Sequence, residues 1–265
     1  MPRRMRLDAE LVRRGLARSR EQAVELIAAG RVTVSGQVSV KAATAIAADT
    51  PVVVQPRRDG PDYVSRGAHK LAGALDILPV RVTGRRCLDA GASTGGFTDV
   101  LLRRGAREVL AVDVGYGLLA WSLRTDARVQ ILDRRNVRHL KLEDIGTSVD
   151  LITADLSFIS LALVVPAMSG LVAPDGDLLL MVKPQFEVGR QRIGKGGVVR
   201  EPLVRAAAVE GVADAAADLG WGAAGIIASS LPGPAGNVEY FLWLRRDAPR
   251  LNADDVRQAV ENGPQ

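Results

Sequence analysis

Apolar residues near the start of the chain recur at helical spacing. Leu7 and Leu11 stand four residues apart, which places them on one face of a short helix that Gly15 ends. Ser19 is a suitable N-cap for a second helix, because Gln22 follows it in a capping-box pattern. The apolar face of this second helix consists of Ala23, Leu26 and Ile27.

The pattern changes to short strands after residue 30. Residues 31–34 and 37–40, in which valine alternates with polar residues, flank Ser35 and Gly36, a dipeptide typical of a tight hairpin turn. Residues 51–54 contain three consecutive valines and predict one more strand. Two helices followed by short strands predict a small α+β domain.

Apolar runs and helical segments alternate from residue 65 onwards. Such runs show little polar alternation, which is typical of parallel strands buried on both faces. We therefore expect a doubly wound, Rossmann-like α/β sheet with its site at the carboxyl ends of the strands. The runs that predict strands are residues 85–89, 108–113, 150–155, 177–183 and 237–244.

These patterns divide the chain into parts with different charge. The formal net charge is +5, and residues 1–60 hold 11 Lys/Arg against 6 Asp/Glu, which leaves 24 of each sign elsewhere. A basic module on a neutral body suggests an anchor for a polyanion, although a solvated basic face is the alternative. The predicted parts are a small domain (1–59), a linker (60–64), an α/β domain (65–248) and a polar tail (249–265).

One cysteine and one uncharged segment bear on the cellular setting. Cys87 has no partner for a disulfide within the chain, which fits a reducing cytoplasm, and we expect no secretory signal. Residues 156–174 carry no charge and approach the length of a membrane-spanning helix. Pro166 and Gly170 interrupt this segment, so we expect a buried helix plus a loop, and no stable membrane association.

A glycine loop in the α/β part predicts a small-molecule site. Residues 91–96 join the strand ending at Asp89 to a helix that begins at Phe97. Such loops let a ligand approach free backbone N–H groups. Asp113 ends the next strand, where a carboxylate can accept both hydroxyls of a ribose. The sequence contains neither Gly-Lys-Ser/Thr nor G-x-G-x-x-G, which argues against ATP and weakens the case for NAD.

Lysine is rare enough here that each one is informative, since the chain has 5 Lys and 30 Arg. Lys183 ends a predicted strand, and Lys70 lies on the helix before the sheet. Arginine cannot replace a lysine that must lose a proton, because its pKa stays above about 12. Asp155 ends another strand, and Glu239 stands among apolar and aromatic residues, where a carboxylate is usually paired. Structural ion pairs are the alternative for both lysines.

The small domain resembles the RNA-binding domain first described in ribosomal protein S-four. The matching residues are Arg6-Leu7-Asp8, Gly15-Leu16, Ser19-Arg20, Ala23, Leu26-Ile27, Gly30-Arg31-Val32 and Gly36. In that family a basic helix face docks on structured RNA. The resemblance implies that phosphates are contacted by Arg3, Arg4, Arg6, Arg13, Arg14, Arg18 and Arg20.

The rest of the chain resembles FtsJ-like RNA 2′-O-methyltransferases, and the whole chain is similar to the TlyA family. The matching runs are residues 65–71, 89–97, 154–160, 182–187 and 236–241. The resemblance implies a catalytic tetrad of Lys70, Asp155, Lys183 and Glu239. It also implies that S-adenosylmethionine (SAM) is bound by Asp89, Gly91, Ser93, Thr94, Gly95, Gly96, Phe97, Asp113 and Asp155.

The TlyA resemblance implies an activity and its alternatives. The family methylates cytidine 2′-hydroxyls in ribosomal RNA (rRNA) of the small subunit and, in some members, of the large subunit, which is linked with sensitivity to capreomycin-type antibiotics. We therefore expect a cytoplasmic SAM-dependent enzyme whose partner is rRNA within ribosomal subunits, with no protein partner evident. No metal is expected, because His69 and His139 lack further ligands. The alternatives are a membrane-active, haemolysin-like protein and a ribosome-binding factor without catalysis.

Overall fold

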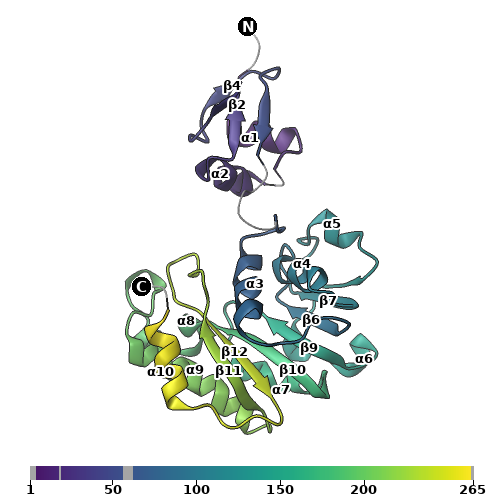
Figure 1. The fold of residues 1–265 in the computed structure, drawn as a ribbon, viewed down its shortest axis with the longest axis vertical. Helices are drawn as coiled ribbons and strands as arrows, with labels where there is room; N and C mark the ends of the chain where they lie inside the picture. The colour runs from purple at the N-terminus through teal and green to yellow at the C-terminus, as the bar shows by residue number, and fades with distance from the viewer. Residues whose placement is uncertain (1–3, 18, 56–61, 264–265) are drawn as a thin grey trace. The chain divides into compact units, whose positions relative to one another are not determined.

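The chain folds into two compact units, Met1–Asp62 and Tyr63–Gln265. Its structure, a computed structural model, describes residues 4–17, 19–55 and 62–263. Figure 1 shows the fold and labels its elements where there is room. Within these described residues, the first unit has two helices with two small sheets, and the second has one seven-stranded sheet.

The first unit contains the two helices, the hairpin and the last strand that the sequence predicts, together with two short strands, β1 and β4, that it did not. Its elements are β1 (Met5–Arg6), α1 (Leu7–Arg13), α2 (Arg20–Ala28), β2 (Val32–Val34), β3 (Gln37–Val38), β4 (Ala45–Ile46) and β5 (Val52–Val54). The Oγ of Ser19 accepts a hydrogen bond from the backbone N–H of Gln22 at 3.2 Å and caps α2. Ser35 and Gly36 turn the β2–β3 hairpin with φ of +49° and +83°, the left-handed conformation that this turn requires. The core consists of Leu7, Leu11, Ala17, Ala23, Leu26, Ile27, Val32 and Ile46.

The second unit alternates strands and helices. Its strands are β6 (Arg86–Ala90), β7 (Glu108–Asp113), β8 (Val129–Asp133), β9 (Val149–Ala154), β10 (Val172–Val182), β11 (Gly222–Ala228) and β12 (Tyr240–Arg245). Its α-helices are α3 (Gly67–Ile77), α4 (Gly96–Arg103), α5 (Trp121–Arg124), α6 (Leu142–Ile145), α7 (Val165–Ser169), α8 (Pro184–Glu187), α9 (Pro202–Ala217) and α10 (Ala253–Glu261). Short 3-10 turns are η1 (Val137–His139), η2 (Leu161–Leu163), η3 (Arg190–Arg192) and η4 (Lys195–Gly197).

The sheet confirms the doubly wound α/β prediction. Its strand order is β11-β12-β10-β9-β6-β7-β8. Strands β10, β9, β6, β7 and β8 are parallel, whereas β12 runs antiparallel to β10 and β11. The chain winds from β6 outward to β8 and then returns to β9 on the other side of β6. The carboxyl ends of β6 and β9 therefore form the topological switch point where such sheets bind ligands.

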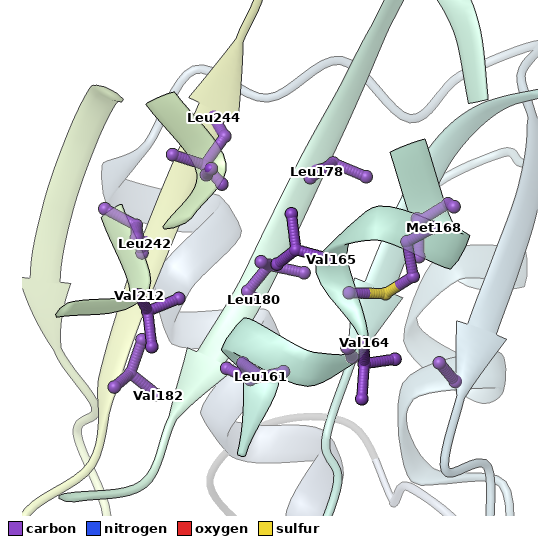
Figure 2. Close-up of a cluster of buried hydrophobic side chains, with 14 of the residues drawn as sticks. Leu161, Val164, Val165, Met168, Leu178, Leu180, Val182, Val212, Leu242 and Leu244 are labelled. Atoms are coloured by element: carbon purple, nitrogen blue, oxygen red, sulfur yellow. The ribbon is translucent and has the colours of Figure 1, made fainter. Parts of the chain in front are cut away.

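Side chains of the central strands alternate between two buried faces. Leu178, Leu180 and Val182 of β10 belong to one apolar cluster, whereas Leu179 and Met181 belong to the other. Helices α7, α9 and α10 cover the first cluster, part of which Figure 2 shows. Helices α3, α4 and α5 cover the second. Burial on both faces explains the continuous apolar runs in the sequence.

Several segments differ in detail from their sequence patterns. The uncharged residues 156–174 form a loop, η2, the short α7 with Val165 and Met168 buried, and the start of β10. No helix among the described residues has the length and apolar character needed to cross a bilayer. Strands β8 and β11 were not predicted; the Gly and Ala residues of β11 give little strand signal. The predicted polar tail, 249–265, is wrong as a separate part, because α10 packs Val256 and Val260 into the first apolar cluster.

Asp89 is an acid inside the central strand β6. Its side chain is fully buried, with 0% exposure. Thr98 Oγ1 donates a hydrogen bond to Asp89 Oδ2 at 2.7 Å, whereas Oδ1 has no hydrogen-bond partner among the described residues. Burial raises the pKa of Asp89 to about 7, the hydrogen bond from Thr98 opposes this, and the charges of Asp155 and Asp113 add to it.

The raised pKa of Asp89 predicts a specific pH dependence of stability. In the unfolded chain the pKa is near 3.9, so between about pH 4 and pH 7 the folded state binds more protons. The free energy of unfolding should therefore fall as pH rises through this window, by up to about 1.4 kcal/mol per pH unit relative to Asp89→Asn. Urea unfolding of both proteins from pH 4 to pH 8 measures this difference, and a pH-independent difference would mean that Asp89 is ionised throughout.

Candidate active site

Strand register gathers four polar residues at one edge of the sheet. Ala154 of β9 is paired with Leu180 of β10, so Asp155 follows at the carboxyl end of β9. Val182 of β10 is paired with Tyr240 of β12, so Lys183 and Glu239 leave the sheet side by side. Lys70 reaches the same place from α3, because its amine contacts Glu239. The structure thus brings together Lys70, Asp155, Lys183 and Glu239.

The four residues form two ion pairs. Lys70 Nζ lies 2.5 Å from Glu239 Oε2, and both side chains are buried, with 9% and 1% exposure. Lys183 Nζ lies 2.6 Å from Asp155 Oδ1, and Asp155 is the more exposed partner of this pair at 24%. This contact is not aligned as a hydrogen bond; Lys183 instead donates one to Ser157 Oγ at 3.0 Å. Each buried ammonium therefore has a carboxylate that offsets part of its desolvation.

The glycine loop after β6 approaches this edge closely. Gly91 has φ of +85°, and a Cβ there would lie 2.6 Å from the carbonyl oxygen of Asp155. Ser93 also adopts a left-handed conformation, with φ of +48°. Glycine would adopt this conformation with less strain, because it has no Cβ. Gly95 has φ of +94° and precedes α4. The path of the loop therefore needs residues that tolerate a left-handed backbone conformation, and at Gly91 it also needs a residue without a Cβ.

Other predicted cofactor residues support the loop. A Cβ on Gly96 would lie 2.9 Å from the backbone nitrogen of Ala68, so α4 and α3 meet closely there. Phe97 is buried and stacks on Phe241 with ring centroids 6.0 Å apart. Thr94 has an exposed side chain, and its carbonyl accepts the backbone N–H of Ala120 at 3.1 Å.

Asp113, at the end of β7, holds the glycine loop through a hydrogen bond. Its Oδ2 accepts the backbone N–H of Ser93 at 2.8 Å, and its Oδ1 accepts that of Gly115 at 2.7 Å. The carboxylate thus fixes two loops and still presents free lone pairs. Apolar side chains are exposed just beyond it, namely Val114 (68%), Tyr116 (66%), Leu118 (48%) and Trp121 (76%).

This loop has the features of a nucleoside site. Asp89 Oδ1 is buried without a hydrogen-bond partner among the described residues, and Asp113 stands where a carboxylate can accept ribose hydroxyls. Exposed apolar surface beyond Asp113 suits a planar base. The residues present therefore fit an adenosine-containing cofactor.

The predicted RNA-binding arginines differ in how far they are engaged within the first unit. Arg6 and Arg20 each contact the buried Asp8, at 2.9 and 3.0 Å, and both remain more than half exposed. The hydrogen bond from Arg6 is the main reason that the pKa of Asp8 lies well below its usual range. Arg4 is exposed, whereas Arg3 and Arg18 lie outside the described residues.

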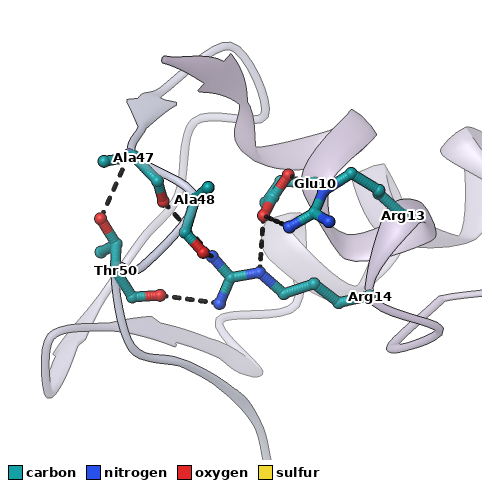
Figure 3. A network of polar contacts seen from close by, with 6 residues as sticks. All are labelled: Glu10, Arg13, Arg14, Ala47, Ala48 and Thr50. Atoms are coloured by element: carbon teal, nitrogen blue, oxygen red, sulfur yellow. Dashed lines mark hydrogen bonds and ion pairs between the residues drawn. The ribbon is translucent and has the colours of Figure 1, made fainter. Parts of the chain in front are cut away.

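A second buried acid, Glu10, holds Arg13 and Arg14 (Figure 3). Arg13 contacts Glu10 at 2.5 Å and is 51% exposed. Arg14 contacts Glu10 at 2.7 Å, is only 20% exposed, and also donates to the carbonyls of Ala47, Ala48 and Thr50. Hydrogen bonds from Arg13 and Arg14 lower the pKa of Glu10 to about 2. Arg14 is therefore part of the domain's internal network, whereas Arg13 keeps an accessible guanidinium edge.

Sequence reasoning did not single out several residues beside the lysines. Ser157 accepts the hydrogen bond from Lys183. Glu187 accepts the backbone N–H of Leu161, four residues after Ser157. The rings of Phe158 and Phe186 lie 5.2 Å apart. All four residues belong to the runs 154–160 and 182–187, which the sequence had already marked as matching the family. Only the fold shows which residues of the two runs contact each other.

Comparisons with known proteins agree with this architecture. The FtsJ-like methyltransferase family matches residues 63–246, and the S4 domain family matches residues 5–44. The chain is 58% identical, over the full length of both proteins, to the 16S/23S rRNA (cytidine-2′-O)-methyltransferase TlyA of Mycobacterium tuberculosis. It is 40% identical to YqxC of Bacillus subtilis, which is named as a candidate rRNA methyltransferase, over 97% of this chain and 92% of that protein.

A solved structure gives the same result for the fold. A protein from Streptococcus thermophilus, named as a candidate haemolysin, is 36% identical and superposes with a TM-score of 0.77, covering 98% of this chain and 95% of that one. The haemolysin name thus attaches to a protein with this same two-part architecture. The chain belongs to the FtsJ-like methyltransferases and, within them, to the TlyA family, whose members add an N-terminal S4 domain.

Proposed function

We propose that this chain methylates the 2′-hydroxyl of cytidine in rRNA, with SAM as the methyl donor. The observation that carries the proposal is the arrangement of two Lys–carboxylate pairs at the sheet edge that the glycine loop adjoins. The printed activity of the M. tuberculosis relative, which matches over both full lengths, supports the substrate. Transfer of tritium from labelled SAM to ribosomal subunits, followed by mapping of 2′-O-methylation, tests it. A ribosomal substrate would place the enzyme in the cytoplasm.

The proposed cofactor site comprises the glycine loop and two acids. Gly91, Ser93 and Gly95 set the path of the loop, Asp113 would accept the ribose hydroxyls, and Asp89 Oδ1 would accept a donor from the ligand side. SAM, when bound, supplies an electrophilic methyl group on a sulfonium. The exposed side chains beyond Asp113 would cover the adenine base.

The proposed catalytic work belongs to Lys183. A ribose 2′-hydroxyl is a weak nucleophile at neutral pH and needs a base or strong orientation. As a neutral amine, the Nζ of Lys183 would accept the hydroxyl proton; as an ammonium, it would instead donate to the hydroxyl oxygen and hold the hydroxyl in line with the methyl group. Asp155 and Ser157 fix this amine from two sides. Glu239 would orient Lys70 and offset its positive charge, so that two lysines can stand at one buried edge.

The first unit would anchor the RNA. Arg6, Arg13 and Arg20 keep half or more of their side chains exposed while one edge is held by a buried acid. Guanidinium groups fixed in this way are well prepared to contact phosphates, since little side-chain entropy remains to be lost. Contacts by Arg3, Arg4 and Arg18 stay part of the proposal. A membrane-active haemolysin is not proposed, because the uncharged residues 156–174 fold into η2, α7 and β10.

Replacement of the proposed base tests the mechanism. Lys183→Arg keeps the positive charge but removes the ability to accept a proton, so methyl transfer should fall by roughly 10²–10⁴-fold while SAM affinity stays near normal. Single-turnover transfer to ribosomal subunits and calorimetry with SAM measure the two effects. Lys141→Arg, on the surface of the same unit, is the matched control. Retention of the rate in Lys183→Arg would remove Lys183 from the role of base.

Removal of the Asp113 carboxylate tests the cofactor site. Asp113→Ala loses the acceptor for Ser93, Gly115 and the ribose, so SAM binding should weaken by about 1–3 kcal/mol with little effect on RNA affinity. Calorimetric titration with SAM measures the loss. Asp126→Ala removes a carboxylate near the amino end of β8 and should bind SAM normally. Equal affinity of the Asp113 and Asp126 variants would place the cofactor elsewhere.

Two arginines of the first unit should separate RNA binding from folding. Arg20→Ala removes an exposed guanidinium, so the slope of log affinity against log salt should decrease by about 1, with little change in melting temperature. Arg14→Ala breaks the network of Glu10 with three carbonyls and should lower the melting temperature instead. Binding to ribosomal subunits across salt concentrations measures the slope. An unchanged slope for Arg20→Ala would remove this arginine from the RNA contacts.

A further inference from the structure

The carboxylate of Glu187 joins two loops beside the proposed base. Glu187 ends α8, which starts directly after Lys183. Its Oε2 accepts a hydrogen bond from Ser160 Oγ at 2.6 Å, and its Oε1 accepts the backbone N–H of Leu161 at 2.9 Å. These donors lie where η2 begins, shortly after Asp155. Glu187 therefore connects the chain that follows Lys183 to the chain that follows Asp155.

The segment 156–160 is thereby held at both of its ends. At its start, the backbone N–H of Asp155 donates to the carbonyl of Ala90 at 3.0 Å, which ties it to β6. At its end, the carboxylate of α8 binds Ser160 and the following N–H. Between these anchors lies Ser157, whose Oγ accepts the hydrogen bond from the Lys183 amine at 3.0 Å. A shift at the second anchor would therefore move a direct partner of the amine.

Phe158 indicates that this segment is held in a defined shape. Its φ of +65° is unusual for a residue other than glycine, and such strain, of order 1–3 kcal/mol, persists only where neighbours impose it. Its side chain is 91% exposed, and its ring lies 5.2 Å from that of Phe186 on α8. Two contacts therefore join the segment to α8: the ring of Phe158 lies against that of Phe186, and the hydroxyl of Ser160 donates to Glu187.

A carboxylate suits this position better than an amide. Burial raises the pKa of Glu187, and the hydrogen bonds from Leu161 and Ser160 lower it, because both donors favour the charged form. A carboxylate offers an acceptor oxygen to each donor, whereas a glutamine offers only one oxygen. Replacement by Gln would therefore leave one of the two anchoring contacts without an acceptor.

We propose that Glu187 is a positioning residue for methyl transfer, which holds Ser157, and through it the Lys183 amine, by tying segment 156–160 to α8. This inference rests on the proposed function, since it gives Lys183 the work on the 2′-hydroxyl. Misplacement of a catalytic group by about 1 Å lowers rates by roughly 10²-fold. Glu187 binds the chain at Ser160 and Leu161, three and four residues after Ser157, so its effect should appear in the rate and not in cofactor binding.

The test compares Glu187→Ala and Glu187→Gln with Glu210→Gln, a control on the exposed face of α9. Single-turnover methyl transfer to ribosomal subunits should fall by roughly 10- to 100-fold in Glu187→Ala, and less in Glu187→Gln, which keeps one acceptor. SAM affinity by calorimetry should match wild type in all three variants. If Glu187 acts through Ser157, the losses in Ser157→Ala and Glu187→Ala should not multiply in the double variant.

Each other outcome overturns the inference. A wild-type rate in Glu187→Ala, multiplying losses in the double variant, or a rate loss accompanied by an equal loss of SAM affinity would each remove the positioning role. Lys183→Arg, measured in parallel, separates this inference from the proposed function. If Lys183→Arg loses the rate and Glu187→Ala keeps it, only the inference fails. If Lys183→Arg keeps the rate, Lys183 is not the base, and the proposal that Glu187 acts by positioning Lys183 is wrong as well.

Discussion

The register of β10 with its two neighbours is the constraint on which the site depends. On one side β10 is parallel to β9, and on the other it is antiparallel to β12. These two pairings bring the carboxyl ends of β9 and β10 to the same edge as the amino end of β12. Asp155, Lys183 and Glu239 each lie one residue beyond a paired position. A slip of one residue would turn every side chain to the opposite face and separate them.

Charge balance within the site follows from this register. Two lysines at one buried edge would repel each other and lose their hydration, at a cost of several kcal/mol per unpaired charge. Each lysine instead has its own carboxylate, Glu239 for Lys70 and Asp155 for Lys183. The pair on Asp155 is the more open of the two, and its amine has a hydroxyl as a second partner. The geometry thus distinguishes an enclosed pair from a more accessible one.

The first unit uses acids in a related way. Asp8 and Glu10 are almost fully buried, yet each binds two arginines whose outer edges differ in exposure. The arginines that give this part of the chain its positive charge are therefore of two kinds, buried in the domain's own network or exposed to solvent. Arg14 satisfies carbonyls inside the domain, whereas Arg20 presents its guanidinium to solvent. A count of charges cannot make this distinction, because it depends on which carbonyls and carboxylates the fold brings within reach.

Local pattern determined much of this protein from the sequence. Apolar periodicity, the Ser19 cap, the Ser35 and Gly36 turn and the glycine loop after Asp89 each depend on neighbours within a few residues, so the sequence was enough to predict them. The tertiary structure alone decided the contacts between distant residues: Lys70 with Glu239, Lys183 with Ser157, and Glu187 with the N–H of Leu161. It also decided that β11 extends the sheet and that Arg14 turns inward. The physical reason is that strand order and register join residues far apart in the chain, and no local spacing encodes which side chain will stand opposite which.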